Sequence, residues 1–290
     1  MNLYAERYIW YLREERNMRE RSLKDYIMAV DLLRSEIKPE SATEFKQVND
    51  AIKNLKAKRS WSTSTTAKIA TCLKNYYAWL AREKIIDSNP FPFHEFKRGR
   101  PKTPEYLTES DFENLIADPL ITTQELAVIR VLWDCAVRVS ELCALDQADL
   151  NFSEGYVHVP REKSKGGYSD RVIPFTEETK SVLSLHVKTL TRNGVTGPLF
   201  VNKWWNRAFP QDISEWLKKI GIRRSRCREA MRLTPHMFRH SFGMRMVPLV
   251  GEIITSKFLG HSSLSMTQQY THLDRESALK IYKNIALKSA

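Results

Sequence analysis

Two arginines that lie far apart in the sequence have neighbours suited to chemistry on an anion. Arg138 opens the segment Arg138-Val-Ser-Glu-Leu142, directly after an apolar run. Arg239 follows His236 by three residues, and both come just after Thr234, a good N-cap, so they share one face near the positive end of a helix. Guanidinium groups bind phosphate oxygens through bidentate, permanently charged hydrogen bonds. The pair therefore predicts stabilisation of the charge that attack on a phosphodiester creates.

A nucleophile and a proton donor are available for the same reaction. Tyr270 follows the segment Leu259-Gly-His261, and a phenol, with a pKa of about 10, forms a phosphate ester that a deoxyribose hydroxyl can attack again. The energy of the broken bond is kept in that ester, so no nucleotide is required. The departing 5′ oxygen needs a proton, and we choose Lys165, in a glycine-containing turn, as the general acid, with Lys163 in reserve.

Zinc binding is the alternative explanation for the histidines. His236 and His240 have the i, i+4 spacing of a zinc-binding helix, but Met-Phe-Arg between them lacks the glutamate of a metalloprotease and supplies a cation instead. The four cysteines are scattered without a Cys-x-x-Cys pair, which argues against a disulfide framework and a thiolate zinc site. We expect no metal and no other cofactor.

The charge of the chain favours a polyanionic partner. Its 290 residues include 46 lysines and arginines against 34 acids, a net charge of +12, and such a balance promotes binding to nucleic acid through counterion release. No apolar run approaches the roughly 20 residues that span a bilayer, and the first residues lack the apolar stretch of a signal peptide. We therefore expect a cytoplasmic protein.

The elements that must position these residues fall into two domains. Apolar stripes at helical spacing, beginning at Tyr4, Leu23, Phe45 and Ile69, predict a four-helix unit over residues 1–87.

Residues 88–105 predict a linker, because four prolines interrupt helical order there. The linker carries four basic residues: Lys97, Arg98, Arg100 and Lys102. A solvated hinge and a strap along DNA phosphates explain it equally well.

Residues 106–290 predict an α+β domain. Strand-like segments at 156–159 and 171–175 enclose the turn that holds Lys165, and helices are predicted at 126–136, 177–190, 211–220, 235–246, 252–259 and 274–287. The expected fold class is thus mainly α with a small antiparallel β-sheet. A basic run that includes Arg223, Arg224 and Arg226 is a further candidate for phosphate contact, with a plain solvated loop as the alternative.

Taken in order, these motifs resemble the tyrosine recombinase (phage-integrase) family, and they are most similar to its compact Xer-type members. The resemblance rests on Arg138 in an Arg-x-Ser-Glu-Leu context, His236-x-x-Arg239, Leu-Gly-His261 and Tyr270. It spans the whole chain, and implies a SAM-like core-binding domain followed by the catalytic domain. The sequence departs from the family in carrying Val137 where Leu is usual, a shortened connection at 247–251 and a slightly longer lysine loop.

The resemblance also implies a role for each candidate. Arg138 and Arg239 would clamp the phosphate with His236 and His261 as accompanying donors, Lys165 would be the strand-borne lysine, Glu141 would support the cluster, and Tyr270 would be the nucleophile. The implied activity is site-specific recombination of double-stranded DNA, through a 3′-phosphotyrosyl intermediate and a Holliday junction. The implied assembly is a homotetrameric synapse in which the C-terminal helix docks in trans.

Two other functions fit parts of this pattern. A type IB topoisomerase uses similar chemistry but reseals the same strand, so it yields no exchanged product. A catalytically inactive DNA-binding regulator would share the basic charge, although it would not need the complete set of six candidate residues.

Overall fold

The computed structural model describes residues 3–42, 44–91, 105–160, 170–225 and 232–260. The chain divides into two compact units, Met1–Thr103 and Pro104–Ala290. Most of the basic linker, including Lys97, Arg98, Arg100 and Lys102, lies outside the described residues.

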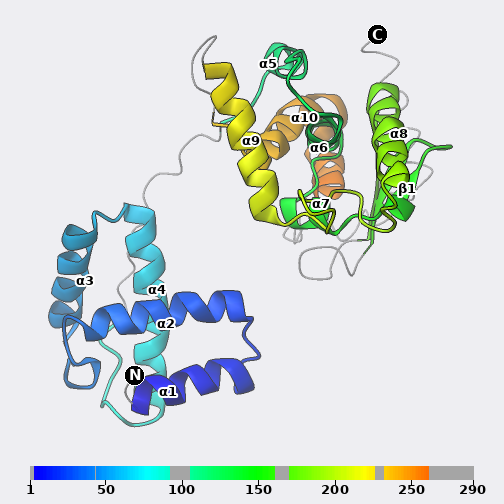
Figure 1. Ribbon diagram of the computed structural model, residues 1–290. Helices are drawn as coiled ribbons and strands as arrows, with labels where there is room; N and C mark the ends of the chain where they lie inside the picture. Colours follow the sequence, from blue (N-terminus) through cyan, green and yellow to red (C-terminus); the bar gives the residue numbers. More distant parts are fainter. Residues whose placement is uncertain (1–2, 43, 92–104, 161–169, 226–231, 261–290) are drawn as a thin grey trace. The chain divides into compact units, whose positions relative to one another are not determined.

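The first unit consists of helices, as the apolar stripes predict (Figure 1). Its elements are α1 (Leu3–Trp10), a π-helical turn (Tyr11–Glu15), α2 (Glu20–Arg34), a 3-10 turn (Pro39–Ser41), α3 (Phe45–Arg59) and α4 (Thr63–Arg82). Helix α4 packs across α2, and its first turn is closed by Ser62, whose hydroxyl accepts a hydrogen bond from the amide of Thr65 at 3.1 Å. The predicted four-helix unit is confirmed.

The second unit combines six helices with a small sheet among its described residues. The helices are α5 (Glu109–Ile116), α6 (Thr123–Cys135), α7 (Val139–Ala144), α8 (Glu177–Arg192), α9 (Pro210–Ser225) and α10 (Pro235–Leu259). A 3-10 turn (Gln147–Asp149) leads into the strands β1 (Leu150–Asn151), β2 (Tyr156–Val159) and β3 (Arg171–Pro174). None of the helices described in either unit is long and apolar enough to cross a lipid bilayer.

The three strands form an antiparallel sheet in the order β1-β2-β3. Tyr156 pairs with Pro174 and Val159 pairs with Arg171, so Arg171 is the residue at which the chain rejoins the sheet after the lysine loop. This mainly helical fold with a small antiparallel sheet confirms the predicted fold class.

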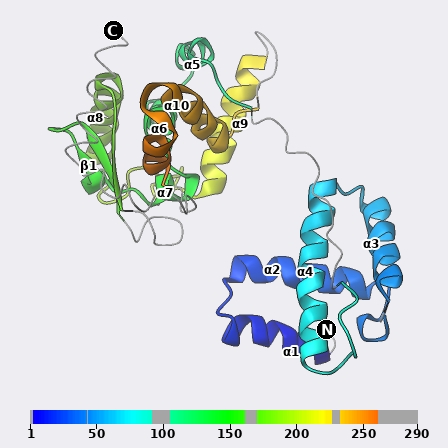
Figure 2. The ribbon, with the colours of Figure 1, turned by 180° about the vertical axis from the view of Figure 1, so that it is seen from behind.

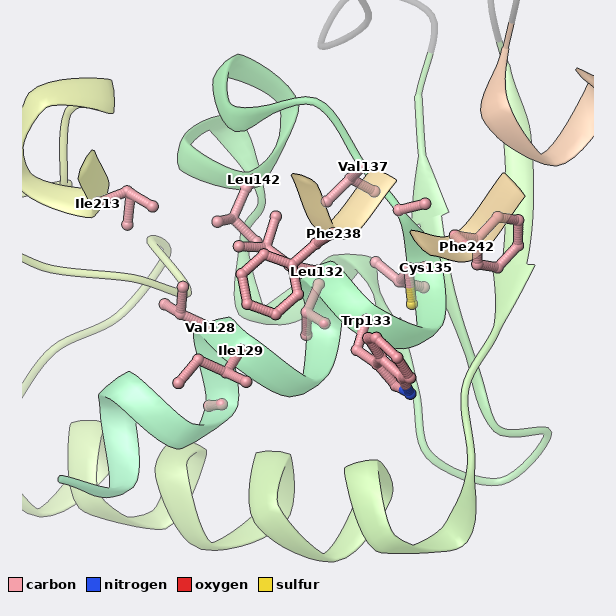
Figure 3. Packing of buried hydrophobic residues seen from close by; sticks show 14 of the residues in the cluster. Val128, Ile129, Leu132, Trp133, Cys135, Val137, Leu142, Ile213, Phe238 and Phe242 are labelled. Atoms are coloured by element: carbon pink, nitrogen blue, oxygen red, sulfur yellow. The ribbon is translucent and has the colours of Figure 1, made fainter. Parts of the chain in front are cut away.

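Helix α6 forms the centre of the second unit, with α8 and α9 on opposite sides of it in both views (Figures 1 and 2). Its buried side chains, among them Val128 and Leu132, pack in one cluster with Phe238 and Phe242 of α10 (Figure 3). Burial of these apolar surfaces is the main favourable contribution to folding of the unit. It also fixes α10 against the end of α6, where Arg138 follows.

Several helix boundaries differ by a few residues from those predicted. The interruption predicted between the helices at 235–246 and 252–259 is present, because α10 has a kink at Gly251, whose φ of 80° and ψ of 164° are not helical; the first helical segment continues up to this kink. Pro248 is accommodated before that kink. Helix α9 runs to Ser225 rather than ending at 220, so Arg223 and Arg224 belong to its last turn. The helix predicted at 274–287 lies outside the described residues.

The stability of the second unit should depend on pH through His186 of α8. This side chain is buried and hydrogen-bonded through Nε2 to the carbonyl oxygen of Leu199 at 2.8 Å. Burial lowers its pKa, against a smaller opposite effect of the Leu199 carbonyl. The unfolded state, with a histidine pKa of about 6.5, therefore takes up a proton more readily, and the stability that His186 contributes above that pH is lost as the pH falls.

We expect His186→Gln, which keeps a donor for Leu199, to flatten the pH dependence of stability. The measurement is the free energy of unfolding in urea at pH 7.5 and at pH 5.5. Wild type should lose more stability between the two than the variant does. Equal losses would show that His186 does not titrate in this way.

Candidate active site

The site begins at the sharp turn between α6 and α7. Ala136 ends α6 in the left-handed conformation, with φ 48° and ψ 30°, which reverses the chain at a cost of about 1–2 kcal/mol. Arg138 then caps α7, and the carboxylate of Glu141 folds back to accept a hydrogen bond from the Arg138 amide at 2.8 Å. This hydrogen bond within the first turn places the Glu141 carboxylate at the start of α7.

Glu141 is completely buried and is held by two arginines. Arg138 Nη1 donates to its Oε1 at 2.8 Å, and Arg171 Nη2 donates to its Oε2 at 2.7 Å. Burial raises the pKa of the carboxyl, but the hydrogen bonding and charge of Arg171, followed by the backbone and side-chain hydrogen bonds of Arg138, outweigh it and leave the pKa lowered. Glu141 is therefore an anion at neutral pH, and two guanidiniums compensate its burial.

The same arginines converge on the C-terminal end of α10. A helix leaves its last carbonyl groups without partners inside the helix, and these carry its negative partial charge. Here three successive carbonyls each accept a hydrogen bond from an arginine: Phe258 from Arg171 Nε at 3.0 Å, Leu259 from Arg239 Nη2, and Gly260 from Arg138 Nη2 at 2.7 Å. Gly260 permits this ending because it adopts the left-handed conformation with φ 62°.

Arg239 hydrogen-bonds both the end of α6 and the end of α10. It is buried in the second turn of α10, and its Nη1 donates to the carbonyl of Ala136 at 2.7 Å while its Nη2 reaches Leu259. Burial lowers its pKa to about 10, and the positive charges of Arg138 and Arg171 act in the same direction. The guanidinium is still protonated at neutral pH, and a negative charge placed beside it would stabilise this protonated form.

The charge balance of this arginine cluster, defined as Arg138, Arg171 and Arg239 around Glu141, is positive. Arg138 and Arg171 are hydrogen-bonded to Glu141, whereas Arg239 donates to carbonyl oxygens and feels the Glu141 charge without a hydrogen bond to it. Among the described residues of the cluster, three guanidiniums thus face one carboxylate, which leaves two positive charges in surplus. The side chain of Arg138 is 20% exposed, whereas that of Arg171 is 6% exposed, so Arg138 is the more accessible of the two. Such a preorganised, partly buried surplus is suited to an anion in which charge develops during reaction.

His236 lies in the first turn of α10, three residues before Arg239, and is exposed. The turn is capped by Thr234, whose hydroxyl accepts a hydrogen bond from the amide of Met237 at 3.2 Å. His240 is also exposed. Within the described part of the chain, no group of three or more histidine, cysteine or acidic side chains is placed to hold a metal ion.

The structure thus gathers Arg138, Glu141 and Arg239, which the sequence singled out, at one helix end. Three other candidates, Lys165, His261 and Tyr270, lie outside the described residues, as does Arg226. Gly260, whose carbonyl Arg138 holds, is the residue directly before His261. The roles assigned to all these residues stay predictions.

Sequence reasoning missed Arg171, which it treated only as the first residue of a strand. A signal was present, because side chains two apart in a strand point to the same face. Ile173 is fully buried, so Arg171 had to face the interior as well. A charged residue at such a position requires a partner, and Glu141 is that partner.

The chain matches two family models over most of its length. The Phage integrase family model matches residues 105–277, and the model of the phage integrase N-terminal SAM-like domain matches residues 5–84. A curated relative, tyrosine recombinase XerC of Listeria innocua, is 27% identical over 293 residues, which cover 96% of this chain and 95% of the relative.

Solved structures share the fold. The Tn1549 transposon integrase, in complex with transposon right end DNA, has a TM-score of 0.76 at 19% identity and covers 98% of this chain and 99% of its own. A lambda integrase tetramer bound to a Holliday junction has a TM-score of 0.69 at 16% identity, with 91% of this chain and 77% of the integrase chain covered.

Proposed function

Because the chain belongs to the phage integrase family, we propose that its arginine cluster holds the scissile phosphate while Tyr270 cleaves and rejoins the DNA strand. The chain is a tyrosine recombinase, an enzyme that acts on DNA at specific sites. The single observation that carries the residue assignment is the surplus of two guanidinium charges at the end of α10. That end leads directly into the segment containing His261 and Tyr270.

In the first step, the phenol of Tyr270 loses its proton to the solvent and its oxygen attacks the phosphorus. A 3′-phosphotyrosyl bond forms, the bond to the 5′ oxygen breaks, and Lys165 supplies the proton that this oxygen requires. In the second step, the 5′ hydroxyl of another strand attacks the phosphotyrosyl bond and releases Tyr270. Exchange of two pairs of strands in this way passes through a Holliday junction.

Arg138 and Arg239 stabilise the negative charge that develops on the non-bridging oxygens. Both are already held by carbonyls of the protein, so little reorganisation is needed when the phosphate binds. His236 and His261 act as further hydrogen-bond donors to the same phosphate. Glu141 orients Arg138 through its carboxylate and does not itself meet the phosphate.

The basic residues outside the cluster supply affinity for DNA. We assign phosphate contacts to the linker residues Lys97, Arg98, Arg100 and Lys102, and to the run of Arg223, Arg224 and Arg226. Such contacts position the duplex without reading its sequence. Residues 1–87 serve as the core-binding domain and residues 106–290 as the catalytic domain, which together clamp one duplex in the cytoplasm.

The assembly on DNA is a homotetramer that brings two recombination sites together. The lambda integrase tetramer bound to a Holliday junction supports this form, since it has the same fold. In our proposal, the C-terminal helix predicted at 274–287 docks into a neighbouring protomer. Its apolar residues, Leu279, Tyr282 and Ile285, are spaced to form the docking face.

The proposal predicts a covalent adduct on nicked suicide DNA that carries the recombination site. On a denaturing gel, wild type should retain labelled DNA, whereas Tyr270→Phe should bind the DNA and form no adduct. Tyr106→Phe is the matched control and should behave as wild type, since Tyr106 is exposed and has no part in the proposed site. An adduct formed by Tyr270→Phe would assign the nucleophile to another residue.

Arg138→Ala should lower the cleavage rate on the same substrate by at least about 100-fold, because one preorganised charge contact contributes roughly 3 kcal/mol to transition-state stabilisation. Binding of the DNA should persist. Arg207→Ala is the control, since Arg207 also binds carbonyls and a carboxylate, those of Cys143, Leu145 and Asp146, but does so outside the cluster. Cleavage by Arg138→Ala near the wild-type rate would show that its role is misassigned.

Deletion of residues 275–290 should abolish cooperative assembly and leave single-protomer binding intact, because the docking helix is lost while Tyr270 remains. Gel shifts on DNA with one half-site and with two half-sites separate these effects. Unchanged cooperativity on the two-half-site DNA would contradict docking in trans.

A further inference from the structure

Arg171 is a buried arginine for which the mechanism above gives no task. Its Nε donates to the Phe258 carbonyl at 3.0 Å, and its Nη2 and Nη1 lie 2.7 and 3.4 Å from the two oxygens of Glu141. One side chain on β3 thus contacts both supports of Arg138, which are the carboxylate at the start of α7 and the carbonyl end of α10. Arg138 itself binds the same carboxylate and the same helix end from α7. Among the described residues of the sheet, Arg171 is the one that contacts both supports.

The contacts of Arg171 distinguish it from a phosphate ligand. Its side chain is 6% exposed, and all three of its nitrogens make bonds within the protein. Arg138 is more open, at 20% exposure. Arg171 also has the largest part in keeping Glu141 ionised against the effect of burial, ahead of Arg138. Glu141 can hold Arg138 by charge only while it is ionised.

We infer that Arg171 is a positioning residue for strand cleavage, which sets the Arg138 guanidinium by holding Glu141 and the Phe258 carbonyl in fixed relation. It acts through Arg138 and does not meet the DNA. Without it, the Glu141 carboxylate would lose one of its two cations and the end of α10 would lose one of its three arginine donors. Displacement of a reacting group by about 1 Å can slow an enzyme by about 100-fold.

The inference rests on the proposed function, so its test uses the same nicked suicide DNA. Three variants of the full chain are compared: Arg171→Met, Arg171→Lys and the control Arg207→Met. A second substrate carries a neutral methylphosphonate at the scissile position, on which Arg138→Ala is also tested. Binding is measured by gel shift, the fold by cooperative thermal unfolding, and cleavage by the rate of adduct formation at saturating DNA.

Arg171→Met should bind DNA within about threefold of wild type and cleave about 100-fold more slowly. Arg171→Lys should recover about tenfold of that loss, because one ammonium can replace part of the fork that binds Glu141. Arg207→Met should cleave within about threefold of wild type. The neutral linkage should restore cleavage in Arg138→Ala, which has lost a charge at the phosphate, and not in Arg171→Met.

Two results would overturn the inference. Cleavage by Arg171→Met within threefold of wild type would show that the contacts are dispensable, and restoration of its cleavage by the neutral linkage would make Arg171 a phosphate ligand. If Arg171→Met does not unfold cooperatively, the cleavage rate of Arg171→Lys decides the question. A wild-type cleavage rate in Arg171→Lys would show that the two guanidinium contacts to Glu141 do not position Arg138. Failure of the proposed function would look different, because wild type itself would form no adduct.

Discussion

The buried Glu141 carboxylate, held between two arginines, is the interaction on which the rest of the catalytic unit depends. A buried charge that loses one partner destabilises a protein by about 3–5 kcal/mol, so Glu141 constrains Arg138 of α7 and Arg171 of β3 together. Both arginines then also bind the carbonyl end of α10. Through these two arginines, the Glu141 carboxylate holds together the start of α7, the start of β3 and the end of α10, which are widely separated in the sequence.

The packing of α6 against α10 makes this arrangement possible. Apolar side chains such as Leu132 and Phe238 fix the two helices with respect to one another, and Arg239 then spans from the Ala136 carbonyl to the Leu259 carbonyl. This arrangement has an electrostatic cost, because burial, followed by the charges of Arg138 and Arg171, lowers the pKa of Arg239 to about 10, and only one carboxylate lies among the three guanidiniums. In the function that we propose, the phosphate of the DNA strand supplies the missing negative charge.

Local patterns in the sequence predicted much of this, and nonlocal contacts account for what they missed. Helical stripes identified most of the described helices of both units, although not the short α7. The spacing of His236 and Arg239 placed them on a helix that begins at Pro235, directly after its cap Thr234. The break predicted between two helices near residue 251 is the kink of α10 at Gly251, and what the sequence did not show is that the first helical segment runs on up to that residue. Arg171 was missed because its partner lies 30 residues away on another element, and no periodicity reveals such a pair.

The most direct measurement of this account is a crystal structure of the Tyr270→Phe variant on a duplex that carries the recombination site. We expect guanidinium nitrogens of both Arg138 and Arg239 within about 2.7–3.2 Å of non-bridging oxygens of the scissile phosphate. Glu141 should still accept hydrogen bonds from Arg138 and Arg171 in that complex. A phosphate bound away from either arginine, or an Arg138 side chain that has left Glu141 to reach it, would contradict the account.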